Sequence, residues 1–262
     1  MKNDALNDVG WPELVRQVRA RTPARLLAGR IGASYDTETQ LRLREDHAAA
    51  RDAVRTEFEL ESHLGREFVA KERLFVVSTR ATSKNEYLLR PDLGRSLSDA
   101  AAKKVAEQCP PGADLQIVIG DGLSVTAVAA QVPPLLTELA REAERRGWKL
   151  GQTFAVRYCR VGLMNQLGEL LRPTVLVLLI GERPGMATAE SLSAYMAFRP
   201  QPGHTDADRN LISNIHGRGT NVTEAAARIG DLAQQMMQHR ASGIAVKEIF
   251  TPDARGLHGG EG

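Results

Sequence analysis

The chain lacks the residues that would mark a disulfide-rich, metal-binding or membrane-spanning protein. Its 262 residues include two cysteines, Cys109 and Cys159, which lie far apart, so we expect free thiols in a reducing compartment. Its six histidines form no H-x-x-x-H pair, which argues against a metal ion bound by the protein. The apolar run Val175–Ile180 is too short to cross a membrane, for which about 20 residues are needed. The first residues hold no apolar signal core, and we therefore expect a cytoplasmic protein without a membrane partner.

The chain also lacks a strong excess of either charge. It carries 34 basic and 32 acidic residues, a formal net charge of +2, which argues against a dedicated nucleic-acid-binding protein. Hydrophobic residues make up 42% of the chain, enough for a substantial core. The length suits one large domain or two modest ones.

An alternation of apolar runs and helical patterns predicts an α/β fold from about residue 74 onward. The predicted strands are Leu74–Val77, Leu115–Ile119, Thr153–Tyr158 and Val175–Ile180. Strands that alternate with helices form parallel sheets with right-handed crossovers. We therefore expect a helical N-terminal segment, residues 1–73, followed by a Rossmann-like domain, residues 74–262, with a parallel sheet flanked by helices.

Capping residues, prolines and polar segments give further predictions about individual elements. Asp36 or Thr37 can cap a helix that runs toward Phe58, and Asn221 or Thr223 can cap a long last helix. The other predictions are a polar loop at 83–92, a helix at 96–108, separate helices around 127–130 and at 133–146, a helix at 161–171, a strand at 192–198, a polar loop at 200–214 and a short strand at 246–250.

The strand Val175–Ile180 runs into Gly181-Glu-Arg-Pro-Gly185, a turn that carries two charges. A strand that ends in this way delivers Glu182 and Arg183 to the carboxyl edge of a parallel sheet, where ligands bind in open α/β folds. Asp121 follows the preceding buried strand in the same manner, and these side chains could meet in one crevice. The alternative is that the glycines only turn the chain and that the charges are solvated. The set can hold a polar ligand by hydrogen bonds, but it offers no evident acid–base pair.

Known catalytic and nucleotide-binding motifs are incomplete in this sequence. Ser124 does not lie in a G-x-S-x-G elbow, and it suits a helix cap instead. Gly120-Asp-Gly122 supplies two glycines of a dinucleotide motif, but Val125 stands where the third belongs, and Asp121 would repel a pyrophosphate. The residues taken alone describe a binding domain, for example a non-catalytic Rossmann-like protein that binds a nucleotide or a sugar.

Six blocks of residues in order resemble one known family. They are Tyr87-Leu-Leu-Arg-Pro-Asp-Leu-Gly-Arg95, Val118-Ile-Gly-Asp-Gly-Leu-Ser124, Val156-Arg-Tyr-Cys-Arg-Val161, Gly181-Glu-Arg-Pro-Gly185, Glu190-Ser-Leu-Ser193 and Asp208-Arg-Asn-Leu-Ile-Ser-Asn-Ile-His216. Together they are similar to the small (light) subunit of ethanolamine ammonia-lyase. The resemblance runs from about Trp11 to Ile244.

The resemblance implies a subunit of an adenosylcobalamin-dependent carbon–nitrogen lyase that converts ethanolamine to acetaldehyde and ammonia by a radical mechanism. In this family a large subunit, a TIM barrel, holds the substrate, and the small subunit covers the cobalamin from the other side within a hetero-oligomer. The cofactor performs the difficult chemistry, so no catalytic residue is expected in this chain. Family members often carry a longer N-terminal extension linked to entry into a bacterial microcompartment. We therefore expect this chain to enter such a compartment with the large subunit, if at all.

Three cofactor-binding positions are carried over from the family. Val161 corresponds to an apolar contact, and Glu182 to an acceptor for corrin amides or a ribose hydroxyl. Leu211 stands where the family often has cysteine. A leucine can still pack against the cofactor, but a role that requires a thiol is not expected. The alternatives are that Val161 only begins the next helix and that Leu211 is an ordinary core residue.

Overall fold

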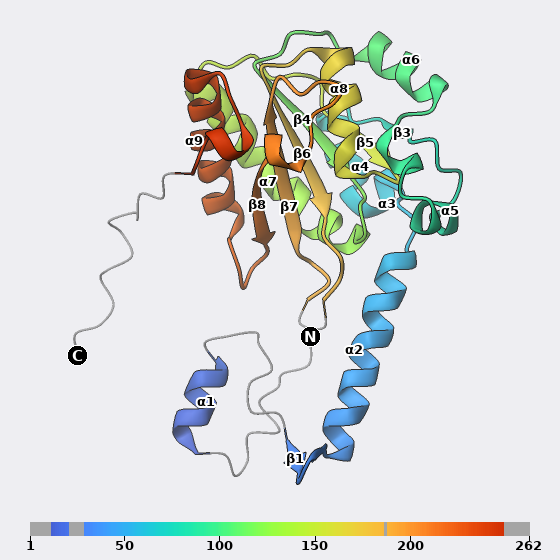
Figure 1. Ribbon diagram of the computed structural model, residues 1–262, viewed down its shortest axis with the longest axis vertical. Coiled ribbons are helices and arrows are strands. Elements are labelled where there is room, and N and C mark those ends of the chain that lie inside the picture. Colours follow the sequence, from blue (N-terminus) through green and yellow to red (C-terminus); the bar gives the residue numbers. More distant parts are fainter. Residues whose placement is uncertain (1–11, 21–28, 186–187, 249–262) are drawn as a thin grey trace, which may run out of the picture.

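The computed structural model describes residues 12–20, 29–185 and 188–248, and a six-stranded sheet lies at its centre (Figure 1). The strand order across the sheet is β3-β5-β4-β6-β7-β8. The strands are β3 Val76–Ser78, β4 Leu115–Gly120, β5 Phe154–Arg157, β6 Val175–Gly181, β7 Leu192–Phe198 and β8 Asn210–Ile215. Every residue of β4 and β6 is buried, because helices cover both faces of these central strands.

The sheet is mixed, and the prediction of a parallel sheet is therefore wrong for its last two strands. Strands β3, β5, β4 and β6 are parallel, whereas β7 runs antiparallel to β6, and β8 antiparallel to β7. The reason lies in the connection between β6 and β7, residues 182–191, which is too short for the crossover of a dozen or more residues that a parallel pair requires. A hairpin-like return is the remaining geometry.

Helices cover the two faces of the sheet unequally. One face packs on α7 (Val125–Arg145) and α9 (Val222–His239), joined by α3 (Leu60–Leu64) and α4 (Arg66–Lys71). The other face packs on α6 (Asp99–Gln108) and α8 (Met164–Leu171). Toward β8 this second face is exposed, since Leu211 on the outermost strand is 45% exposed. Helices therefore leave this face of the sheet partly uncovered at β8.

The N-terminal elements lie outside the six-stranded sheet. They comprise α1 (Glu13–Ala20), a small hairpin of β1 (Arg30–Ile31) and β2 (Ser34–Tyr35), and α2 (Thr37–Arg55). Figure 1 shows α2 extending away from the sheet, and none of its residues is buried. Asp36 caps α2 as predicted, accepting a hydrogen bond of 2.6 Å from the Thr39 amide.

Several element predictions are confirmed, and others need correction. The predicted cap Asn221 begins α9, and Ser124 caps α7. Helix α7 is continuous through its two prolines, so the predicted separation into two helices is wrong. The segments predicted as polar loops contain α5 (Lys84–Leu89) and β8. Residues 246–248 are not in a strand, and the rest of that predicted strand lies outside the described residues.

Candidate functional site

The carboxyl ends of β4, β5 and β6 meet at one edge of the sheet, and each is followed by a polar residue of interest. Asp121 follows β4, Cys159 lies just after β5, and Glu182 follows β6. The parallel register places Gly120 beside both Val156 and Ile180, so the three strand ends are neighbours. This edge is the one at which α/β sheets place ligands.

Glu182 is half-buried, and its carboxylate accepts three hydrogen bonds from the protein. Ser193 donates its hydroxyl to Oε1 at 2.6 Å, and Asn214 donates its backbone N–H to the same oxygen at 2.9 Å. Ser191 donates its hydroxyl to Oε2 at 2.7 Å. Hydrogen bonds to a carboxylate are strong, so three of them fix the position of the Glu182 side chain.

Val161 begins the 3-10 helix Val161–Leu163 and is half-buried against the apolar cluster on the α8 side of the sheet. Tyr195, on β7, is a half-buried member of the same cluster. The prediction that Val161 begins a helix is therefore confirmed, while its side chain also packs against this apolar cluster. Tyr195 itself was not singled out from the sequence, because its partners come from other strands.

Leu211 lies on β8 and pairs with Tyr195, which in turn pairs with Leu178 on β6. Paired residues project to the same face of a sheet, so Leu211 lies on the face that carries Tyr195 and Val161. Its 45% exposure makes the alternative of an ordinary core residue wrong for this chain. We call Val161, Tyr195 and Leu211 the open face.

Glu182 lies near the open face. Burial raises the pKa of the Tyr195 phenol, and the negative charges of Asp206 and Glu182 raise it further. The phenol therefore keeps its proton and can donate a hydrogen bond. Ser193, which holds Glu182, pairs with Ile180 of the same apolar cluster. The sheet register thus places Leu211 and Ser193, a hydrogen-bond donor to Glu182, on the face of the sheet against which the cluster containing Val161 packs.

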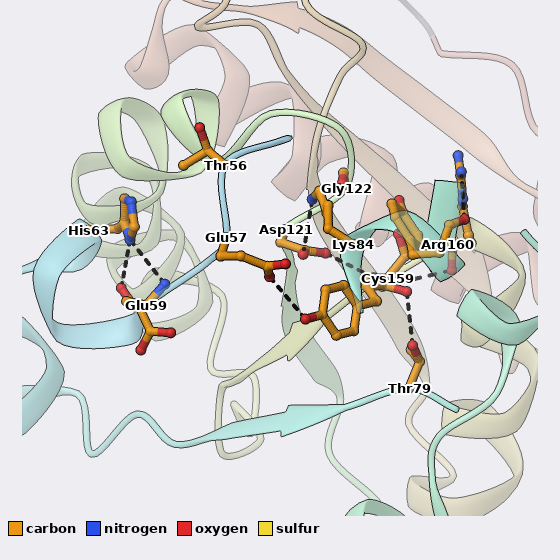
Figure 2. Close-up of polar contacts among 12 residues, drawn as sticks. Thr56, Glu57, Glu59, His63, Thr79, Lys84, Asp121, Gly122, Cys159 and Arg160 are labelled. Carbon is orange, nitrogen blue, oxygen red and sulfur yellow. Dashed lines mark hydrogen bonds and ion pairs between the residues drawn. The ribbon is translucent and has the colours of Figure 1, made fainter. Parts of the chain in front are cut away.

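Asp121 has a different role from Glu182, because its side chain points into the protein (Figure 2). The Lys84 ammonium lies 3.4 Å from Asp121 Oδ2 and donates a hydrogen bond of 3.2 Å to the Gly122 carbonyl. The Cys159 amide donates to Asp121 Oδ1 at 2.9 Å. Burial raises the pKa of Asp121, and the Lys84 charge opposes this shift. Asp121 and Glu182 therefore do not face one crevice.

The loop that contains α5 is attached to the end of β5 around a buried tyrosine. Tyr87 is fully buried and donates its hydroxyl to the Cys159 carbonyl at 2.9 Å. The Arg160 guanidinium lies 4.2 Å from the centre of the Tyr87 ring, a cation–π distance. This network explains why Lys84 reaches Asp121, a pairing that the sequence did not reveal.

The Gly120-Asp-Gly122 turn packs closely against the end of β6. Gly122 has a φ of 56°, and a Cβ there would lie 2.3 Å from the Gly181 carbonyl oxygen. The ends of β4 and β6 are therefore in contact at the point where a nucleotide-binding loop would open. Among residues 12–20, 29–185 and 188–248, no group of three His, Cys, Asp or Glu side chains could hold a metal ion. Within the same ranges, no helix has the length and apolar character to span a membrane.

Both cysteines, Cys109 and Cys159, are buried free thiols, as predicted. Other site residues were missed from the sequence, namely Lys84 and the donors to Glu182. Ser191, just before β7, and Ser193, within β7, are two residues apart, which is a local signal, but their shared partner Glu182, just after β6, is visible only in the fold.

Comparison with known proteins identifies the family. Residues 12–247 match the model of the family described as ethanolamine ammonia-lyase light chain (EutC). A protein named ethanolamine ammonia-lyase small subunit from Clostridium perfringens is 43% identical over 235 residues, which cover 90% of this chain and 78% of that protein. Proteins of the same name from Clostridioides difficile (42% identical, 90% and 78% covered) and Listeria innocua (40% identical, 88% and 77% covered) are also similar. The chain therefore belongs to the ethanolamine ammonia-lyase light-chain family.

Proposed function

We propose that this chain is the small subunit of an ethanolamine ammonia-lyase, an enzyme that converts ethanolamine to acetaldehyde and ammonia. The observation that carries the proposal is similarity at 40–43% identity across about nine tenths of the chain to proteins that bear this subunit name. A small subunit requires a large one, so we propose a hetero-oligomer in which the large subunit binds ethanolamine. This chain supplies no acid–base pair of its own at the described sheet edge.

The open face and Glu182 have the chemistry that adenosylcobalamin would need. A corrin ring is broad and apolar, and its rim carries carboxamide groups. Val161 and Leu211 would give apolar contacts, and the Glu182 carboxylate would accept a hydrogen bond from a corrin amide or a ribose hydroxyl. When bound, the cofactor supplies the radical chemistry. The task of this chain is to bind it, orient it and exclude water from one side.

We further propose that residues 74–262 act as a Rossmann-like unit with an antiparallel extension, preceded by the helical segment 1–73. The assembled enzyme would reside in the cytoplasm or within a bacterial microcompartment, which this chain would enter with the large subunit. The alternative, a nucleotide- or sugar-binding protein without catalysis, is disfavoured by the contact between Gly122 and Gly181 and by the burial of Asp121.

The test is co-expression with the large subunit from the same genome, followed by measurement of acetaldehyde production with and without added adenosylcobalamin. We expect activity that needs both chains and the cofactor. Each chain alone is the control. Equal activity from the large subunit alone, or no association between the chains, would contradict the proposed function.

A further inference from the structure

Among the residues that the structure describes, three donors reach the Glu182 carboxylate, which leaves one acceptor position for a ligand. An ionised carboxylate offers about four lone-pair positions, two on each oxygen. Ser193 and Asn214 occupy the two on Oε1, and Ser191 occupies one on Oε2. The remaining position is therefore on Oε2. Because Oε1 is fully engaged, the carboxylate cannot rotate without breaking two hydrogen bonds.

The donor from β7 is rigid. Ser193 is 3% exposed and pairs with Ile180, one pair from the end of the β6–β7 ladder. A buried hydroxyl on a strand that is paired with β6 has little freedom to move, and it needs an acceptor, which Glu182 provides. Ser193 therefore places Oε1 in a defined position relative to the sheet.

The donor from β8 depends on an unusual backbone conformation. Asn214 has a φ of 61°, in the left-handed region that most residues avoid, and the pairing of β7 with β8 shifts register next to it. This conformation directs the Asn214 N–H toward Glu182. An added Cβ on Gly219 would lie 2.3 Å from the Asn214 carbonyl oxygen, so the following turn packs closely against it.

His216 holds Asn214 in this conformation. Its side chain is 4% exposed, and Nε2 lies 2.7 Å from Asn214 Oδ1. The Arg218 amide donates to His216 Nδ1 at 3.2 Å, so Nδ1 is an acceptor and the proton of the neutral ring is on Nε2. His216 therefore donates to Asn214, whose backbone donates to Glu182.

We propose that Ser193 and His216 are positioning residues for the contact between Glu182 and the cofactor. Ser193 acts on Glu182 directly, and His216 acts through Asn214. Together they aim the free acceptor position of Oε2 at a hydrogen-bond donor, an amide N–H or a hydroxyl, on the rim of the bound cobalamin. This inference rests on the proposed function, and it concerns how tightly the cofactor is held rather than how fast the reaction proceeds.

The test is a double-mutant cycle on the assembled two-subunit enzyme. The Kd for adenosylcobalamin is measured by absorbance titration for the native enzyme, Ser193→Ala, Glu182→Ala and the double variant, and kcat is measured at saturating cofactor. We expect Ser193→Ala to raise the Kd about tenfold, which corresponds to the loss of one hydrogen bond to a charged group, with kcat nearly unchanged. In the Glu182→Ala background, Ser193→Ala should change the Kd less than twofold, because there is no carboxylate left to position.

Ser98→Ala is the matched control. Ser98 caps α6 by accepting a hydrogen bond from the Ala101 amide, and it makes no contact with Glu182. Its loss lowers stability without altering the carboxylate, so the Kd should not change. His216→Leu tests the second residue in the same cycle and should raise the Kd in the native background but not with Glu182→Ala. If His216→Leu fails to assemble, the Ser193 cycle decides the inference.

The outcomes separate the two proposals. If Glu182→Ala leaves the Kd unchanged, the proposed cofactor contact is wrong. If Glu182→Ala weakens binding but Ser193→Ala does not, or if the two effects simply add, the contact stands and the positioning inference is overturned. Coupled effects on the Kd, with Ser98→Ala unchanged, support the inference.

Discussion

Two carboxylates follow adjacent strands at the same edge of the sheet, and burial gives them different tasks. The side chain of Asp121 is fully buried beside the Lys84 ammonium, whereas Glu182 is half-buried and satisfied by hydroxyl and amide donors. A buried charge is stable only when it is paired, because removal from water costs several kcal/mol per ion. Asp121 thus holds the α5 loop to the sheet, and Glu182 keeps an acceptor available to a ligand.

Replacing Lys84 should make stability depend more strongly on pH. Lys84→Met leaves Asp121 buried without its partner, so the pKa of Asp121 rises further above its unfolded value. The folded state then binds a proton more readily than the unfolded state, and stability falls as pH rises through the folded pKa. We expect urea denaturation to show a loss of about 3–5 kcal/mol at pH 8 and a smaller loss at pH 5.

Two further variants control this experiment. Asp121→Asn, added to Lys84→Met, should remove the extra pH dependence, since no carboxyl group remains to titrate. Lys103→Met replaces an exposed lysine of α6 and should cost little at either pH. Equal losses at pH 5 and pH 8 for Lys84→Met would show that the Lys84 charge does not act on Asp121.

At the scale of elements, α7 is a long helix that tolerates two prolines. Pro133 and Pro134 lack the N–H groups that would bond the carbonyls four residues earlier. The helix continues because a wide apolar face is buried against the sheet and α9, and this packing outweighs the lost hydrogen bonds. The buried residues are Val125, Ala127, Val128, Gln131, Val132, Leu135, Leu136, Leu139 and Ala143.

Pro134→Ala should therefore stabilise the protein. Pro134 is exposed, so its replacement removes little packing, restores a backbone donor and introduces a residue of high helix propensity. We expect a gain of about 1–3 kcal/mol in urea denaturation. Pro202→Ala is the control, because Pro202 is an exposed residue of the connection between β7 and β8 and should not gain stability in this way. A loss of stability for Pro134→Ala would mean that the proline ring itself stabilises the folded chain.

The elements that the sequence predicted well are those whose signal is local. Strands β4 and β6 are buried on both faces, so their sequences are nearly continuous apolar runs. Glu182 could be predicted as a site residue because it follows such a run. Strand β8 was missed because half of its residues are exposed and most of these are polar. The partners of Glu182 and Asp121 were missed for a different reason. They depend on strand register and on contacts between residues 9 to 38 positions apart, which no local pattern encodes.

At the scale of the whole molecule, contacts between described residues attach the C-terminal end of α2 to the sheet domain. Phe58 is buried just beyond the helix. The Glu57 carboxylate accepts a hydrogen bond of 2.9 Å from the Tyr158 hydroxyl (Figure 2). Arg157 forms an ion pair with Glu59 at 2.9 Å. These contacts attach the end of α2 to the carboxyl end of β5. The helix itself buries no residue, and Leu41 is 58% exposed. The isolated subunit therefore exposes apolar side chains at two places, Leu41 on α2 and Leu211 on the open face.

Hydrogen exchange should distinguish these regions from the core. A helix that buries no side chain depends on its intrinsic propensity, which is marginal for about 20 residues in water. In the isolated chain we expect the amides of α2 to exchange within seconds to minutes at neutral pH, whereas those of α7 persist for hours, because α7 opens only with the global unfolding of the core. Protection of α2 equal to that of α7 in the isolated chain would contradict this assignment.

The same measurement on the two-subunit enzyme tests what covers the exposed regions. If the large subunit and the cofactor cover the open face, β8 should gain protection on assembly, and the β8 gain should depend on added adenosylcobalamin. If the large subunit also binds α2, that helix should gain protection whether or not the cofactor is present. Protection of α2 alone would place the subunit contact on the N-terminal segment and leave the open face without its proposed ligand. Leu211→Ser, which places a polar side chain on the open face, should then leave cofactor binding unchanged, whereas the proposed contact requires it to weaken.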